Sequence, residues 1–125
     1  MLRGELVPRN KIDFDTVRKI ALALSDVEES TAYGASAFKV GGKLLACTPA
    51  NKSAEPDSLM VRIDFAQRAE LLAAAPDVYY LTDHYVNYPS VLVRLSRIHA
   101  DALRDLMGMA WRFVTAKTPG KKRAK

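Results

Sequence analysis

Residues 37–48 read AFKVGGKLLACT, and this stretch decides the fold. Two runs rich in apolar residues flank Gly41-Gly42, and a two-residue loop between two such runs is typical of a β-hairpin. The loop needs positive φ angles, which glycine adopts without steric cost. The stretch therefore predicts a hairpin with strands over 37–40 and 43–48, and with it an antiparallel sheet.

Regular elements are also predicted on both sides of this hairpin. Asp13 and Asp15 suit the N-terminus of a first helix, and Asp64 with Gln67 forms a capping-box pattern ahead of a second helix that stops at Pro76. Hydrophobic periodicity gives the remaining bounds. Besides the hairpin, the predicted elements are helix 13–24, strand 58–63, helix 65–75, strands 78–81 and 90–95, and helix 99–116.

The order helix, hairpin, strand, helix, two strands, helix predicts an α+β fold of two layers. Its mainly antiparallel sheet would carry the helices packed on one face. A chain of 125 residues is close to the commonest size of one domain. We expect a flexible N-terminal arm over 1–11, a single domain over 12–116 and a basic disordered tail over 117–125.

Composition favours a cytoplasmic protein. The hydrophobic fraction is 49%, and no apolar run near the N-terminus is long enough for a signal peptide or a membrane span. The single cysteine, Cys47, cannot form an intramolecular disulfide, which favours a reducing compartment. We expect no membrane partner, and a monomer is favoured slightly.

The net charge of +5 is unevenly distributed. Five of the 19 lysines and arginines lie in the last nine residues, and the rest of the chain holds 14 basic and 14 acidic residues. The tail could add phosphate contacts to nucleic acid without reading its sequence. The basic candidates there are Lys117, Lys121, Lys122 and Arg123.

Strand periodicity divides the predicted sheet into two faces. The residues expected to face the helices are Phe38, Val40, Leu45, Cys47, Leu59, Val61, Ile63, Val91, Val93 and Leu95. The opposite face would carry Leu44, Ala46, Met60 and Leu92 together with three cations, Lys39, Arg62 and Arg94. An apolar face with cations near its middle is a candidate nucleic-acid-binding platform. The alternative is that the N-terminal arm or a second subunit covers it.

Residues 79–88, YYLTDHYVNY, hold four tyrosines and a histidine. Tyrosine rings can stack on nucleobases, and histidine titrates near neutral pH. The candidate pocket residues are Tyr33, His84, Tyr85 and Tyr88. The alternative is structural, because amphipathic rings commonly pack with their polar tips hydrogen-bonded.

Catalytic and metal-binding patterns are weak. Gly41-Gly42-Lys43 lacks the earlier glycine and the following Ser or Thr of a phosphate-binding loop. Cys47 and His84 could pair as nucleophile and base, but no third residue is indicated to orient them. One cysteine and two histidines fit no zinc spacing. We therefore expect no enzyme, no cofactor and no metal.

Several motifs, in order, resemble the YjbR/MmcQ family, and the resemblance spans about residues 12–118. The family is similar in fold to CyaY and frataxin, and its members are commonly labelled predicted DNA-binding proteins. Frataxins present an acidic ridge to iron, whereas Arg18 and Lys19 here follow the first aspartates, so an iron site is not indicated. The motifs are FDTVR (14–18), TAYGASAFKVGGK (31–43), APDVYYLTDHY (75–85), PSVLVRL (89–95) and AWR (110–112).

Three functions follow as hypotheses. The resemblance implies DNA binding, which would use the sheet face and the basic tail. The alternative is a non-enzymatic module that binds a protein or a small ligand through the same face or the tyrosine loop. An enzyme with its site near Tyr33, His84 and Tyr85 has the least support.

Overall fold

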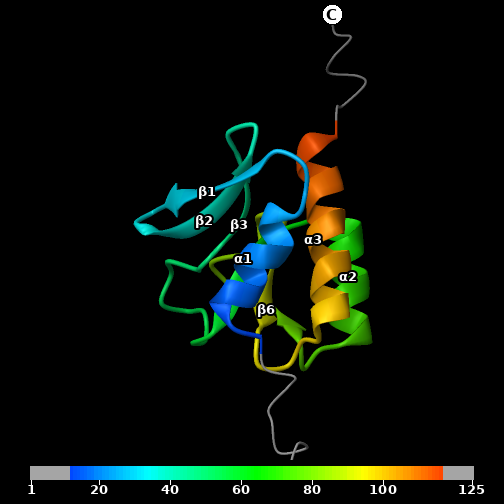
Figure 1. Cartoon of the computed structure of the whole chain (residues 1–125). Coiled ribbons are helices and arrows are strands. Elements are labelled where there is room, and N and C mark those ends of the chain that lie inside the picture. The colour runs from blue at the N-terminus through cyan, green and yellow to red at the C-terminus, as the bar shows by residue number, and fades with distance from the viewer. Residues whose placement is uncertain (1–11, 117–125) are drawn as a thin grey trace, which may run out of the picture.

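The computed structural model describes residues 12–116 (Figure 1). The predicted arm over 1–11 and the predicted tail over 117–125 lie outside the described residues. Three helices and a six-stranded sheet make up the described part. No helix within it is both long enough and apolar enough to cross a bilayer.

All neighbouring strands in the sheet pair antiparallel. The spatial order is β1-β2-β3-β4-β6-β5, so β5 and β6 exchange places relative to the sequence. The predicted α+β fold is confirmed. The strands are β1 (Val27–Ala32), β2 (Ala35–Val40), β3 (Lys43–Cys47), β4 (Ser58–Arg62), β5 (Tyr79–Tyr80) and β6 (Ser90–Arg94).

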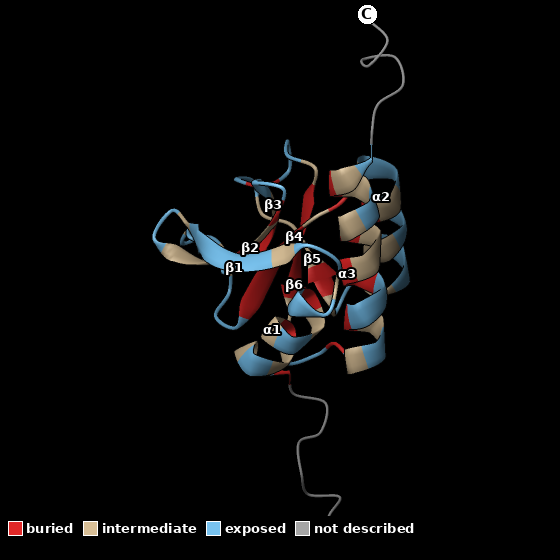
Figure 2. Cartoon of the chain, turned by 45° about the horizontal axis from the view of Figure 1, so that its top comes forward, coloured by how far each residue is buried: buried red, intermediate tan, exposed pale blue. Residues whose placement is uncertain are grey.

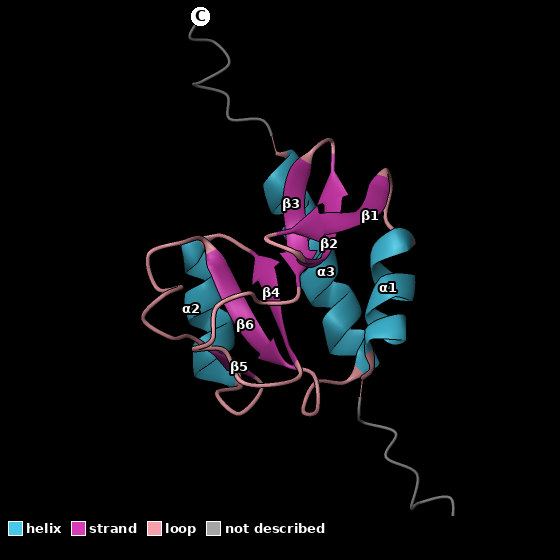
Figure 3. Cartoon of the chain, turned by 90° about the vertical axis from the view of Figure 1, so that its left-hand side faces the viewer, coloured by secondary structure: helices cyan, strands magenta, loops and turns pink. Residues whose placement is uncertain are grey.

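The helices lie together on one face of the sheet, as predicted (Figure 3). They are α1 (Phe14–Leu22), α2 (Phe65–Ala74) and α3 (Ala100–Thr115). Asp13 caps α1 by accepting a hydrogen bond from the Thr16 N–H at 2.9 Å. Asp64 caps α2 in the same way, 2.7 Å from the Gln67 N–H, which confirms both predicted helix starts.

β1 is an edge strand that was not predicted. Its sequence is VEESTA, and its four central residues are exposed (Figure 2). Such a strand has no apolar alternation, because it is held by backbone pairing with β2 and not by burial of a face. Glu28 and Glu29 put charge on this edge, which discourages pairing with another chain.

The main core lies between the helices and the sheet. β2, β3, β4 and β6 contribute its strand residues, with Phe38, Leu45, Leu59 and Val91 fully buried. Figure 2 shows the burial concentrated on the central strands. Every residue predicted to face the helices does so except Cys47.

A β-bulge explains this exception. Phe38 pairs with Ala46 but Lys39 pairs with Leu44, so Leu45 is an extra residue in β3. Leu45 and Ala46 therefore both enter the main core, and Cys47 turns to the opposite face. The expected positions of Ala46 and Cys47 were wrong because strict alternation does not survive the extra residue.

The opposite face of the sheet is not a bare platform. Cys47, Met60 and Leu92 form a second, smaller apolar cluster there with Tyr85. Tyr85 and Ala54 come from the connections that follow β5 and β3, so these connections cover part of the face. The covering leaves a pocket.

Candidate functional site

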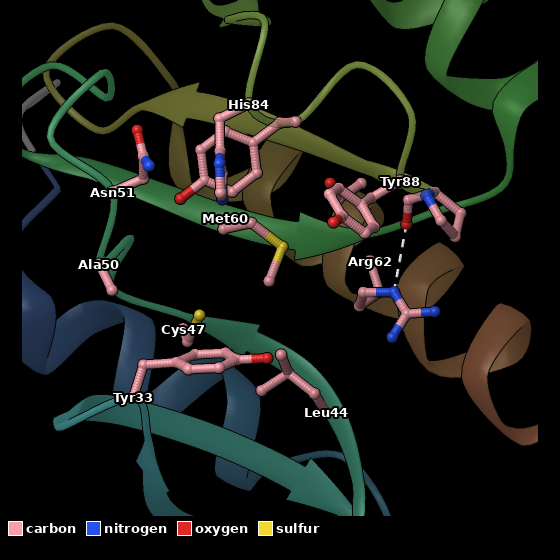
Figure 4. Close-up of a pocket in the computed structure, with 12 residues that line it drawn as sticks. Tyr33, Leu44, Cys47, Ala50, Asn51, Met60, Arg62, His84 and Tyr88 are labelled. Atoms are coloured by element: carbon pink, nitrogen blue, oxygen red, sulfur yellow. Dashed lines mark hydrogen bonds between the residues drawn. The ribbon is translucent and has the colours of Figure 1, made fainter.

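The pocket has a volume of about 570 Å³ and lies on the sheet face opposite the helices (Figure 4). Four parts of the chain line it: the β1–β2 turn, β3 with the connection after it, β4, and the segment from 84 to 90. Its size is in the range of about 300–1,000 Å³ common for small-molecule sites. The pocket is thus large enough for a small molecule, and it forms where the loops leave this face of the sheet uncovered.

All four predicted pocket residues line this cavity. Tyr33 reaches it from the β1–β2 turn, while His84, Tyr85 and Tyr88 reach it from the segment before β6. Figure 4 shows Tyr33 beside Cys47 and Leu44, across the pocket from His84 and Tyr88. The structure thus brings together residues that lie more than fifty positions apart in sequence.

Tyr33 has an unusual backbone conformation. Its φ is +54° and that of Gly34 is +77°, which is the pattern of a type I′ turn. Asn, Asp or Gly usually takes the first of these positions, because the left-handed region costs a residue with a Cβ about 1 kcal/mol or more. The side chain is also 86% exposed. A strained, exposed aromatic residue at the mouth of a pocket points to a binding role.

On the other side of the pocket, the His84 ring lies beside both Tyr85 and Tyr88. The His84 ring meets Tyr85 edge-on with centroids 4.7 Å apart, and lies 6.2 Å from the Tyr88 ring. Tyr85 is buried, and burial raises the pKa of its phenol, partly offset by hydrogen bonding to the Asn51 backbone. Tyr88 is 57% exposed, so its ring face is accessible.

Arg68 holds this aromatic segment in place, and it was not predicted as a site residue. Its guanidinium donates to the carbonyl oxygens of Val86 (2.9 Å), Tyr88 (2.8 Å) and Ser90 (3.2 Å). It also stacks over the Phe65 ring at 4.7 Å. The sequence shows only an arginine on a short, alanine-rich helix, and helical periodicity alone does not show which loop its side chain will reach.

Arg62 supplies a cation to the pocket. Its Nε donates to the Pro89 carbonyl at 3.2 Å, and the guanidinium lies 5.8 Å from the centre of the Phe113 ring. Within residues 12–116 it has no carboxylate partner. Figure 4 shows it at one end of the pocket, beneath Tyr88.

The three predicted sheet cations do not form a cluster. Arg62 pairs opposite Ser90 and Arg94 opposite Ser58, so the two arginines lie at opposite ends of the β4–β6 pair. Arg94 makes a two-pronged ion pair with Glu55 at 2.9 Å and stacks on Tyr80 at 4.3 Å. Lys39 lies opposite Leu44 at the far side of the sheet.

Two further groups in the pocket bear on its chemistry. Cys47 is buried and burial raises the pKa of its thiol, so the reactive thiolate is disfavoured. Cys47 and His84 both line the pocket, but no hydrogen bond joins them among the described residues. The Ser90 hydroxyl is buried, lines the pocket and has no partner in the described structure.

Charge in the folded part does not favour a polyanion. Residues 12–116 contain 11 lysines and arginines against 13 aspartates and glutamates. Within the same residues no three His, Cys, Asp or Glu side chains lie close enough to hold a metal ion. The lining of the pocket is instead mostly aromatic and apolar, with one arginine.

The fold and the pocket define a small α+β domain with a ligand-sized cavity on the sheet face that the helices leave open. The chain belongs to the YjbR family, whose model matches residues 22–113, and this confirms the resemblance. An uncharacterized protein of Mycobacterium bovis and another of Mycobacterium tuberculosis are each 39% identical to it, over 78% of this chain and 84% of theirs.

A solved structure shares the fold. The crystal structure of Deinococcus radiodurans protein DR2400, described as a DUF419 domain, matches with a TM-score of 0.69. The two chains are 23% identical, and the match covers 94% of this chain and 89% of that one. At this identity the likeness concerns the fold alone.

Proposed function

We propose that the protein is a non-enzymatic binding module that takes a small ligand in the tyrosine pocket. The observation that carries this is the convergence of Tyr33, His84, Tyr85 and Tyr88 on one cavity from two distant segments. An apolar floor with aromatic walls and a few polar groups is the usual composition of a ligand site. A buried thiol of raised pKa gives little support to catalysis there.

A pair of tyrosine variants tests the pocket. We expect the neutral dye phenylnaphthylamine to gain fluorescence on binding the full chain, and the double variant Tyr33→Ala/Tyr88→Ala to lose most of this gain. Leu22→Ala is the matched control, since Leu22 is a large apolar side chain, 43% exposed, on α1 behind the sheet. Equal binding by the double variant and the wild type would contradict the proposal.

DNA binding is a second candidate, and the cluster of basic residues at 117–125 favours it. The sheet face gives DNA binding less support, because Arg94 is paired with Glu55 and Arg62 lies apart from Lys39. In this proposal the tail makes sequence-independent phosphate contacts, so affinity falls steeply with salt.

Charge removal in the full chain tests the DNA proposal. Lys117, Lys121, Lys122 and Arg123 are changed together to serine, and anisotropy with a labelled mixed-sequence duplex is measured at two salt concentrations. We expect the affinity to fall steeply at low salt, and any remaining affinity to depend less on the salt concentration. Unchanged affinity would remove the tail from any DNA-binding role, and binding then lost in Arg62→Gln would assign it to the pocket face.

A further inference from the structure

The pocket combines a flat apolar surface with a single fixed charge. Leu44 and Met60 form part of its floor, and the exposed rings of Tyr33 and Tyr88 stand at its rim. Rings at a rim favour a flat ligand, because π-faces stack with little conformational entropy lost. These features favour an aromatic ring system over a flexible aliphatic chain.

The charge comes from Arg62. Among the described residues that line the pocket, it is the only one that carries a permanent charge, and none of them is a carboxylate. Its Nε is engaged by the Pro89 carbonyl, which holds the guanidinium in place, while its two Nη groups have no partner in residues 12–116. A guanidinium with free N–H groups at the end of a pocket suits a carboxylate, sulfonate or phosphate.

Ser90 places a buried hydroxyl next to Arg62. Its side chain is 98% buried, as its relative exposure is 2%, and its hydroxyl has no partner among the described residues. Ser90 lines the pocket and pairs with Arg62 across β4 and β6, so its hydroxyl lies at the cationic end.

We infer that the pocket selects a planar aromatic ligand that carries an anionic group. The ring lies against Tyr33 and Tyr88, and the anion accepts hydrogen bonds from the Arg62 guanidinium. Two sources share this chemistry, an aromatic carboxylate and a nucleotide. The assignment rests on the proposed function of the pocket, because it names the ligand class of the same site.

Two dyes with the same ring system test the preference. Anilinonaphthalene sulfonate differs from phenylnaphthylamine in carrying a sulfonate, so the ratio of their dissociation constants isolates the anion. We expect the full chain to bind the sulfonate about tenfold tighter than the neutral dye, and Arg62→Gln to lose this preference. Arg97→Gln, an exposed arginine outside the pocket, is the control.

The outcomes separate the ligand class from the proposed function. If the dyes bind equally, or Arg62→Gln keeps the preference, the pocket does not select anions although it remains a binding site. If neither dye binds, the proposed function fails as well. Arg62→Met keeps a long apolar side chain at this position and replaces Arg62→Gln if thermal unfolding shows that the latter is not folded.

Competition then distinguishes the two sources. Displacement of the sulfonate dye by deoxyadenosine monophosphate, but not by deoxyadenosine, supports the anion preference and assigns a phosphate. Displacement of the sulfonate dye by naphthoate, but not by naphthalene methanol, supports the anion preference and assigns a carboxylate. Failure of both anions to displace the dye better than their neutral counterparts would overturn it.

Discussion

Tyr33 shows how a single residue can link stability to function. It occupies a left-handed position of a type I′ turn that asparagine takes more readily, and its ring contributes little to the core because it is 86% exposed. A residue that strains the backbone without filling the core is usually retained for another reason. In our proposal, contact of the ring with a ligand in the pocket is that reason.

Tyr33→Asn should therefore stabilise the protein and weaken binding. We expect the free energy of unfolding to rise by about 1 kcal/mol, because Asn-Gly relieves the strain at this turn. Urea unfolding of the two proteins checks the stability, and phenylnaphthylamine fluorescence checks the binding. A loss of stability in Tyr33→Asn would mean that the ring packs more than its exposure indicates.

Arg68 acts on the pocket through the segment that carries the other aromatic residues. Arg68→Met removes the donor that satisfies the carbonyls of Val86, Tyr88 and Ser90, and we expect it to lower the free energy of unfolding by about 2 kcal/mol. Binding of the neutral dye should fall as well, since His84 and Tyr88 lose their support.

Urea unfolding and dye titration measure these two effects. Arg97→Met is the control for losing an arginine, because Arg97 is exposed in the turn before α3. If Arg68→Met unfolds like the control, the three hydrogen bonds do not determine the position of the segment.

At the scale of elements, the sequence predicted what local chemistry determines. The β2–β3 hairpin follows from two glycines, both of which have positive φ in the structure. The starts of α1 and α2 follow from Asp13 and Asp64, whose side chains accept the expected hydrogen bonds. In each case one residue type satisfies a local requirement of the backbone.

Features that depend on distant partners were not predictable in this way. β1 is fixed by pairing with β2, and the bulge at Leu45 depends on the register between two strands. Three of the four aromatic residues of the pocket were proposed from the composition of residues 79–88, with Tyr33 named beside them. Arg62 was assigned to an open platform because nothing in the sequence shows which loops will cover the sheet. Arg68 was missed for the same reason.

The connection between β3 and β4 is held by an ion pair that should respond to pH. Hydrogen bonds from Arg94 lower the pKa of Glu55 below its ordinary value of about 4.3. A carboxylate with a lowered pKa in the folded state stabilises the protein above its ordinary pKa, and this contribution is lost as the pH falls through the folded-state value.

Glu55→Gln should thus be less stable than the wild type at neutral pH and equally stable in acid. Thermal unfolding of both proteins at neutral pH and at a pH below the folded-state pKa of Glu55 measures the difference in stability. Because both side chains are partly exposed, we expect the difference to be small and to shrink further in high salt. A difference that persists unchanged in acid would show that the carboxylate charge is not responsible.

For the whole molecule, the excess of basic residues and the pocket lie in different parts of the chain. The folded part holds slightly more acidic than basic residues and carries the pocket, whereas the basic excess lies at 117–125. We therefore expect that each of the two proposed functions can be removed without the other, because they are assigned to different regions. This separation makes the pocket testable apart from any contact with nucleic acid.

Amide NMR spectra recorded during a titration of the full chain with phenylnaphthylamine test the pocket most directly. Our account predicts that the largest shift changes fall on residues around Tyr33, Asn51 and His84 to Ser90, which come together only at this cavity. Shift changes confined to the helical face or to the tail would place binding elsewhere and contradict the account.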